Sequence, residues 1–293
     1  MPSPDDRPPR LPVTGGILHL VPTPIGNPED ITLRALRILR EADVVAAEDT
    51  RVAAQLLRAH DLHKPLVSYH DHNEVARATE LVERIRGGAR VALVSDAGTP
   101  LVNDPGWRVV RACIDAGLPI DVLPGPCAAV VALAGAGLAV DRFYYGGFLP
   151  RDEGPRREAL AEIAALRATL VFYESPVRLG DTLDTVAALW PARQVCVARN
   201  LTKSFEQWIR GTAAEARATL GEETRGEVVL LIAGAPEGAT VEVSSLDGDI
   251  LRMAGEGLGA KDIATQLAAA TGLPRRELYQ RVLAVTRPAQ PRR

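Results

Sequence analysis

Short apolar runs alternate with amphipathic helical patterns over the first 125 residues, and this alternation limits the fold more than any other feature. A helix must carry the chain back along the sheet before each new strand can run parallel to the previous one. The sequence therefore predicts an α/β fold with a mostly parallel sheet and right-handed crossovers. We expect strands at 17–21, 44–47, 66–68, 91–94 and 120–123, and helices near 32–41, 50–59, 73–86 and 106–116.

A second α/β domain is predicted after Pro124-Gly125-Pro126, which opens a helix of small residues at Cys127. The expected strands are 143–148, 169–173, 194–198, 205–211 and 227–233, with helices near 156–167, 178–190 and 212–220. The connection between the third and fourth of these strands is too short for a crossover, which indicates a hairpin and a mixed sheet.

We predict four parts: a disordered start (1–15), an N-terminal α/β domain (16–126), a C-terminal α/β domain (127–238) and a small helical appendage (239–293). The appendage shows helical patterns near 246–255, 260–270 and 275–286, and the turn at 271–274 resembles a helix-turn-helix. Residues 274–293 hold six arginines and one acid, although the whole chain has a net charge of -3. This basic end favours a polyanionic partner, but a solvated helix face explains the charge equally well.

Three cysteines at wide spacing (Cys113, Cys127, Cys196) form no disulfide or metal pattern, so we expect reduced thiols and a cytoplasmic protein. The start lacks the apolar core of a signal peptide. The longest apolar run, residues 128–140, is too short to span a bilayer. We therefore expect neither a membrane segment nor a metal site.

Polar loops follow most of the predicted strands, at 23–27, 48–51, 70–73, 95–105, 124–127, 173–176 and 199–203. The carboxyl ends of parallel strands meet at one edge of a sheet, and ligands commonly bind there. The loop at 95–105 is rich in Gly, Pro, Asp and Asn, which lets a ligand approach the backbone closely. It can equally be a plain strand-to-helix connection in which Asn103 or Asp104 caps the next helix.

Each of the other loops also has a structural alternative. Glu48 and Asp49 are placed to cap the helix that begins near Thr50. His70 and His72 flank Asp71 as metal ligands could, but no third ligand is spaced with them. Glu174 and Arg178 match a salt bridge at a helix start, and Lys203 matches a surface charge. The chain has no P-loop and no G-x-G-x-x-G after its first strand, which argues against NTPases and dehydrogenases.

Six segments, taken in order, closely resemble one family: VPTPIGN at 21–27, AAEDTR at 46–51, HDHN at 70–73, SDAGTP at 95–100, PGPCA at 124–128 and FYESP at 172–176. They are similar to the tetrapyrrole methylase (class III S-adenosylmethionine methyltransferase) superfamily, and within it to the branch that methylates a ribose 2'-hydroxyl of 16S rRNA. The resemblance covers residues 17–234. It implies two α/β domains with a donor cleft between them, S-adenosylmethionine (SAM) as cofactor, and a homodimer. It further implies 16S rRNA or the small ribosomal subunit as partner, and cytidine 1402 of the decoding region as target.

The resemblance also assigns site residues by motif. The SAM contacts it implies are Ser95, Asp96, Ala97, Gly98, Val102, Pro124, Gly125, Cys127, Ala128, Phe148, Glu174, Arg199, Asn200, Leu201, Gly226, Glu227 and Val228. The RNA contacts expected from the acceptor-side loops and the basic appendage are Thr23, Asn27, Arg51, His70, His72, Arg178, Arg275, Arg276 and Arg281. Asn200 departs from the Glu expected in this family, and Val177 stands where a His is common, so neither an acid role at 200 nor a required His at 177 carries over.

Methyl transfer from a sulfonium needs in-line positioning and a group that takes the proton of the ribose hydroxyl. The candidates for this base are Asp49, Glu48 and Lys203, in that order, while Asp104 could act through a cap or the donor loop. Two other functions stay open: a tetrapyrrole C-methyltransferase of the same fold, and a non-enzymatic nucleic-acid-binding protein that reads RNA through the appendage.

Overall fold

The computed structural model describes residues 15–220, 225–236, 246–271 and 274–286. By internal contacts the chain divides into two compact units, one made of 1–135 with 198–207 and the other of 136–197 with 208–293. The first unit therefore includes a short segment that lies far along the sequence. The predicted disordered start lies, except for Gly15, outside the described residues.

The first unit contains a five-stranded parallel sheet, as predicted. Its order is β3-β2-β4-β1-β5, and each pair of neighbouring strands in it is parallel. The strands are β1 (Ile17–Leu20), β2 (Val44–Ala47), β3 (Leu66–Ser68), β4 (Arg90–Val94) and β5 (Ile120–Val122). The helices are η1 (Pro28–Asp30), α1 (Leu33–Glu41), α2 (Thr50–Ala59), α3 (Glu74–Arg86), α4 (Trp107–Asp115) and α5 (Ala128–Gly135).

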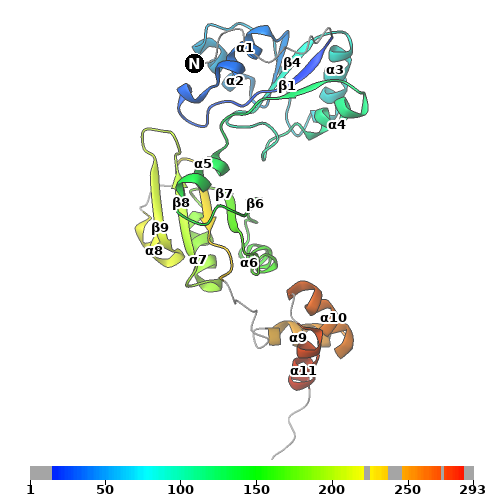
Figure 1. Cartoon of the computed structure of the whole chain (residues 1–293), viewed down its shortest axis with the longest axis vertical. Helices are drawn as coiled ribbons and strands as arrows, with labels where there is room; N and C mark the ends of the chain where they lie inside the picture. Colours follow the sequence, from blue (N-terminus) through cyan, green and yellow to red (C-terminus); the bar gives the residue numbers. More distant parts are fainter. Residues whose placement is uncertain (1–14, 221–224, 237–245, 272–273, 287–293) are drawn as a thin grey trace, which may run out of the picture. The chain divides into compact units, whose positions relative to one another are not determined.

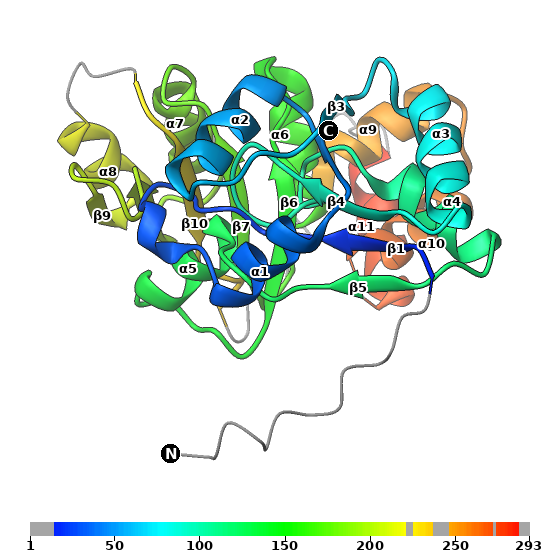
Figure 2. The same cartoon turned by 90° about the horizontal axis from the view of Figure 1, so that it is seen from above.

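Helices cover both faces of this sheet because its strands are apolar on both faces. In β2, Val44 and Ala46 pack with α3 and α4, whereas Val45 and Ala47 pack with α1 and α2. Successive side chains of a strand point to opposite faces, so one short run supplies two cores. Figures 1 and 2 show the two helix pairs on either side of the strands.

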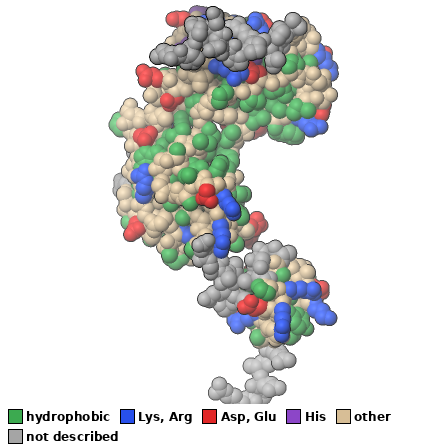
Figure 3. All heavy atoms as spheres, in the orientation of Figure 1, with side chains coloured by type: hydrophobic (Ala, Val, Ile, Leu, Met, Phe, Trp, Pro, Cys, Tyr) green, Lys and Arg blue, Asp and Glu red, His purple; other side chains and the backbone are tan. Residues whose placement is uncertain are grey.

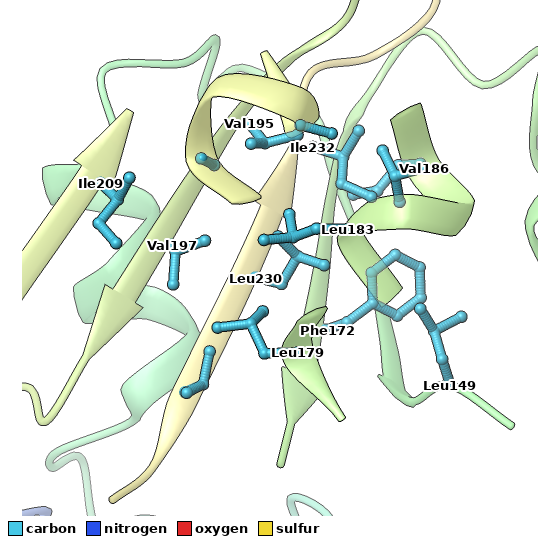
Figure 4. Close-up of a cluster of buried hydrophobic side chains, with 14 of the residues drawn as sticks. Leu149, Phe172, Leu179, Leu183, Val186, Val195, Val197, Ile209, Leu230 and Ile232 are labelled. Atoms are coloured by element: carbon cyan, nitrogen blue, oxygen red, sulfur yellow. The ribbon is translucent and has the colours of Figure 1, made fainter. Parts of the chain in front are cut away.

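The second unit has a mixed sheet of order β6-β7-β10-β8-β9, in which β6 and β7 are parallel and β7 and β10 antiparallel. The strands are β6 (Phe143–Phe148), β7 (Thr169–Glu174), β8 (Gln194–Arg199), β9 (Gln207–Thr212) and β10 (Val228–Ile232). The helices are α6 (Glu153–Glu162), α7 (Leu179–Leu189) and α8 (Ala213–Thr219). Leu183 and Val186 of α7 pack on Phe172 and Leu230 of the sheet (Figure 4).

Three helices follow, α9 (Asp247–Gly255), α10 (Ala260–Thr271) and α11 (Arg275–Thr286). They share a hydrophobic core of their own, which includes Ile250, Ile263, Leu278 and Val282. The predicted helical appendage is thus present as a three-helix unit with an independent core.

Observed and predicted elements differ most at α6 and before β9. We expected α6 to start at residue 156, after Gly154-Pro155, but it starts at Glu153. Proline is tolerated in the first turn of a helix because its missing N–H has no helical partner there. Phe205 was expected in a strand, but β9 begins at Gln207 and Phe205 lies in the preceding loop.

Candidate active site

The loops after β1 and β4 are joined by an isolated bridge at the carboxyl edge of the first sheet. The Thr23 amide donates to the Gly98 carbonyl at 2.9 Å, and the Gly98 amide donates to the Thr23 carbonyl at 3.1 Å. The Thr23 hydroxyl also donates to the carbonyl of Ser95 at 3.2 Å. The Gly98 amide is thus already used inside the protein, so this loop leaves fewer backbone donors for a ligand than we expected.

The loop at 95–106, which we call the donor loop, has an unusual backbone. Leu101 and Asn103 have φ values of 73° and 68°, a left-handed conformation that costs a non-glycine residue about 1 to 3 kcal/mol. Gly106 stands at the N-cap of α4, so neither Asn103 nor Asp104 caps this helix. A plain strand-to-helix connection has no need of such strain, and strain of this kind concentrates at ligand-binding sites.

The segment at 124–128 packs against the same two loops. The Thr99 hydroxyl donates to the Pro126 carbonyl at 2.8 Å. Gly125 lies so close to Pro22 that a Cβ atom at this position would overlap the proline ring. The structure therefore brings three predicted site segments together. They are the donor loop and residues 124–128, where SAM contacts are predicted, and the β1 loop, where RNA contacts are predicted.

A fourth segment, residues 200–206, joins this edge from far along the chain; we call it the 200–206 loop. The Asn27 amide donates to the Thr202 hydroxyl oxygen at 2.9 Å. A Cβ atom at Gly26 would lie 2.7 Å from the Leu201 carbonyl oxygen, so the two backbones touch. Asn200, Leu201 and Lys203 thus lie in the first unit with the β1 loop.

Carboxyl groups gather at this edge from the loops after β2, β3 and β4. Burial, together with the nearby charges of Asp96 and Asp71 and against a hydrogen bond from Ser95, raises the pKa of Asp104 to about 6. Burial also raises the pKa of Glu48, with added repulsion from Asp104 and Asp96. These two carboxyl groups hold a proton more tightly than ordinary acids, which suits a general base near neutral pH.

Asp49 has the opposite environment. Its side chain caps α2 by accepting the Arg51 amide at 2.8 Å, and it forms an ion pair with the Arg51 guanidinium at 2.6 Å. The Arg51 hydrogen bonds lower the pKa of Asp49 to about 2. A carboxylate with so low a pKa accepts a proton poorly, so Asp49 falls behind Glu48 and Asp104 as a base. Sequence reasoning underrated Asp104, whose signal was an acid within the glycine- and proline-rich loop that follows β4.

The histidines of the β3 loop show no metal-binding arrangement. The His70 ring meets the Asn73 side chain at 3.1 Å and the His72 ring edge-on, with ring centroids 5.9 Å apart. Among the residues that the structure describes, no group of three or more His, Cys, Asp or Glu side chains could hold a metal ion.

In the second unit, the predicted site residues Phe148, Glu174 and Val228 lie at one edge of the mixed sheet. Val228 pairs with Glu174, and Phe148 pairs with Tyr173 and contacts its ring edge-on. Gly226 has a φ of 106° just before β10, a conformation that favours glycine. Arg199 is buried at the end of β8.

The Glu174 carboxylate is buried and committed to partners inside this unit. It accepts hydrogen bonds from the Ser175 amide at 2.7 Å and the Thr182 hydroxyl at 2.7 Å, and it pairs with Arg178. Arg178 also donates to the Leu149 carbonyl. Glu174 and Arg178 therefore tie β7 to the start of α7.

In the three-helix appendage, Arg275 and Arg276 are exposed at the start of α11. Arg281 is instead held by Asp247, with Nε 2.7 Å from Oδ1, and this ion pair joins α11 to α9. Basic side chains show on the surface of this part in Figure 3. Among the described residues of the appendage, Arg275 and Arg276 therefore place two exposed cations next to each other at the start of α11.

Across the described ranges, no helix is both long enough and apolar enough to span a membrane.

Comparisons with known proteins agree with this architecture. Residues 17–217 match the model of the Tetrapyrrole (Corrin/Porphyrin) Methylases, and residues 247–285 match the RsmI C-terminal HTH domain. A relative from Micromonospora olivasterospora named Ribosomal RNA small subunit methyltransferase I is 45% identical, over 94% of this chain and 89% of its own. A relative of the same name from Pasteurella multocida is 43% identical, over 90% and 96%.

Solved structures show the same fold. The uroporphyrin-III-C-methyltransferase of Thermus thermophilus superposes with a TM-score of 0.53 at 26% identity, covering 74% of this chain and 94% of that one. A diphthine synthase gives a TM-score of 0.58 at 17% identity, with 74% and 90% coverage. Neither covers the whole chain, because about a quarter of it lies outside the shared fold.

Proposed function

The chain belongs to the tetrapyrrole (corrin/porphyrin) methylase family and is a methyltransferase, and from this premise we propose that it methylates a ribose 2'-hydroxyl of 16S rRNA with SAM as donor. The relatives at 43–45% identity carry the name of a small-subunit rRNA methyltransferase. The proposed nucleotide within this rRNA is cytidine 1402 of the decoding region. The active species is a cytoplasmic homodimer that acts on the rRNA or the small subunit.

One observation supports the chemistry above the others: two carboxyl groups of raised pKa, Glu48 and Asp104, lie beside the strained donor loop. A ribose hydroxyl is a weak acid, so its oxygen attacks well only as its proton passes to a base. In the proposed mechanism the Glu48–Asp104 pair takes that proton while the loops hold the hydroxyl in line with the methyl group.

The same carboxyl groups fit the donor. SAM supplies a methyl group on a positively charged sulfur, and an edge that carries Glu48, Asp96 and Asp104 attracts a cation. The Thr23–Gly98 bridge and the contact of Thr99 with Pro126 hold the donor loop in one conformation. A preorganised edge of this kind favours binding of the sulfonium donor, because the loops need not rearrange to meet it.

The individual donor contacts remain predictions. In the first unit we propose Ser95–Gly98, Val102, Pro124–Ala128 and Asn200–Leu201, with Gly98 acting through packing rather than through its amide. In the second unit the predicted contacts are Phe148, Glu174 and Gly226–Val228. Arg199, at the end of β8, is a further predicted contact and groups with the first unit. For RNA the strongest candidates are Arg51, Arg275 and Arg276, whose side chains are exposed.

A tetrapyrrole C-methyltransferase is the second candidate, favoured by the solved uroporphyrin-III-C-methyltransferase fold. That neighbour covers 74% of the chain, whereas the rRNA methyltransferase relatives cover 90% or more, including the helix-turn-helix appendage. The extra domain therefore favours the RNA substrate.

The decisive experiment incubates the full-length protein with labelled SAM and small subunits from a strain that lacks this protein. Ribose methylation is then mapped by resistance of the RNA backbone to alkaline cleavage, and a parallel reaction offers a porphyrinogen. The proposal predicts a new 2'-O-methyl group at cytidine 1402 and no label in the porphyrinogen. Label on a base, on another nucleotide or on the porphyrinogen contradicts it.

A further inference from the structure

The 200–206 loop has a fixed conformation rather than a slack one. Asn200 and Thr202 have φ values of 52° and 64°, so two non-glycine residues are left-handed within three positions. The Lys203 amide donates to the Asn200 carbonyl at 3.0 Å, and the Thr202 amide donates to the Glu206 carboxylate at 2.7 Å. Holding two such residues costs free energy, and proteins keep that kind of strain mainly where a loop must present something.

The 200–206 loop is connected to the donor loop through one intermediate loop. Thr202 accepts the Asn27 amide, and Gly26 touches the backbone of Leu201. Thr23, in the same β1 loop, forms the bridge to Gly98. Two sets of backbone contacts thus fix the position of the 200–206 loop relative to the donor loop.

This loop presents an aromatic ring to solvent. Phe205 is 83% exposed, the most exposed aromatic side chain in the described part of the chain. Exposing a phenyl ring forgoes the free energy that its burial would give. The exposure of Phe205 does not come from a loose loop, because the carboxylate of the next residue, Glu206, accepts the Thr202 amide and holds the loop in place.

The charges of the loops at this sheet edge indicate what covers the ring. Glu48, Asp96 and Asp104 repel phosphate groups from the acidic part of the edge. The 200–206 loop itself carries one cation, Lys203, and Arg51, which is paired with Asp49 but has a side chain that is 86% exposed, stands at the start of α2. An aromatic face next to cations is the arrangement that binds single-stranded RNA, in which bases stack on rings and phosphates meet Lys and Arg.

We propose that Phe205 is a stacking platform for a nucleobase of the RNA strand that carries the methyl acceptor. The base rests on the phenyl face, the flanking phosphates lie toward Lys203 and Arg51, and the ribose hydroxyl reaches the carboxyl edge. This inference rests on the proposed function, because it takes RNA as the substrate. Phe205 is thus a positioning residue that fixes the nucleotide.

The test compares Phe205→Ala, Phe205→Leu and Phe205→Tyr in the full-length protein, with Ile114→Ala as control. Ile114 is an exposed apolar residue at 55%, near the end of α4 and hence at the opposite edge of the sheet. We measure kcat/KM on small subunits at saturating SAM, the Kd for a single-stranded RNA oligonucleotide at several salt concentrations, and the Kd for SAM by calorimetry.

Phe205→Ala is expected to weaken RNA affinity and kcat/KM by about five- to hundredfold, the range for losing one base–aromatic stack. Phe205→Leu is expected to be nearly as impaired, because it keeps apolar bulk but has no flat face, whereas Phe205→Tyr restores binding. SAM affinity and the salt dependence of RNA binding stay unchanged. Lys203→Ala, by contrast, is expected to reduce the salt slope by about one unit.

Other outcomes overturn the inference in distinguishable ways. If the wild type methylates the subunit and Phe205→Ala binds and reacts normally, the platform is wrong and the proposed function stands. If Phe205→Ala loses SAM affinity instead, the ring holds the donor. If Phe205→Leu equals the wild type, the contact is not stacking. If the wild type methylates no rRNA but Phe205→Ala still weakens oligonucleotide binding, the platform stands and the proposed function fails.

Discussion

Neighbouring carboxyl groups at this sheet edge differ in what their surroundings let them do. Asp49 is held by the amide and guanidinium of Arg51, which favour its charged form and lower its pKa to about 2. Asp104 is half-buried among other acids, which disfavours its charge and raises its pKa to about 6. Both follow polar strand ends in the sequence, so residue type and position alone did not separate them.

The raised pKa of Asp104 predicts a pH dependence for both activity and stability. If the Glu48–Asp104 pair is the base, kcat/KM rises with pH through about 6 and levels off above it, since the base must be ionised. Asp104→Asn is expected to lower kcat and to remove or shift this limb of the profile. A profile that keeps the same limb in Asp104→Asn and loses it in Glu48→Gln assigns the proton transfer to Glu48 alone.

Stability follows the opposite direction with pH. The folded state binds the Asp104 proton more tightly than the unfolded state does. This proton therefore adds to the free energy of unfolding below pH 4, and the added stability is lost as the pH rises to about 6. Asp104→Asn is therefore expected to gain free energy of unfolding relative to the wild type between pH 4 and 7, by about 1 to 3 kcal/mol. Urea titrations at both pH values measure this gain, with Asp115→Asn on the exposed face of α4 as control.

Among the elements, those set by hydrophobic periodicity were predictable and those set by loop contacts were not. β2, α2 and α11 have the predicted bounds, because apolar spacing fixes which face of each element is buried. The Thr23–Gly98 bridge and the Thr202–Asn27 contact join segments 75 and 175 residues apart, and no local pattern encodes such pairs. Phe205 was predicted in a strand because it is apolar, and the local sequence does not indicate that this side chain is exposed to solvent.

Gly98 links the donor loop to its neighbours, and a side chain there is expected to abolish SAM binding. Its φ of 80° strains any β-branched residue, and a Cβ atom would lie 3.3 Å from Ile25 and 3.5 Å from the Pro126 carbonyl oxygen. We predict that Gly98→Val loses measurable SAM binding by calorimetry. Gly117→Val is the matched control, because Gly117 has a φ of 65° and open space around its Cβ position. Equal SAM affinity in the two variants would show that the bridge does not support the donor loop.

At the scale of the whole molecule, the family fold and the appendage are separate parts of the chain. The family model ends at residue 217 and the helix-turn-helix model begins at 247, and the appendage has a core of its own. The motifs in the sequence predicted both parts and the fold class. The sequence did not predict that residues 198–207 group with the first unit. This grouping depends on tertiary contacts with the β1 loop, such as the Asn27–Thr202 hydrogen bond, which no local sequence pattern encodes.

Removal of residues 240–293 is expected to leave SAM binding intact and to weaken binding to small subunits. The exposed Arg275 and Arg276 are the residues expected to meet phosphates, so the truncated protein should also show a smaller salt slope. Filter binding at several salt concentrations measures both quantities. Arg275→Ala/Arg276→Ala in the full chain separates lost charge from lost structure, and an unchanged affinity in the truncated protein would exclude the appendage from RNA binding.

The return of residues 198–207 to the first unit also sets an order of events during synthesis. The Asn27 amide donates to the Thr202 hydroxyl oxygen, and Gly26 lies against Leu201, Thr202 and Lys203. A ribosome that has released the first five strands has therefore produced a sheet whose ligand edge is still incomplete. The edge is finished only after residues 136–197 of the second unit have emerged, so a nascent chain arrested before residue 200 holds a folded sheet with an unsupported β1 loop.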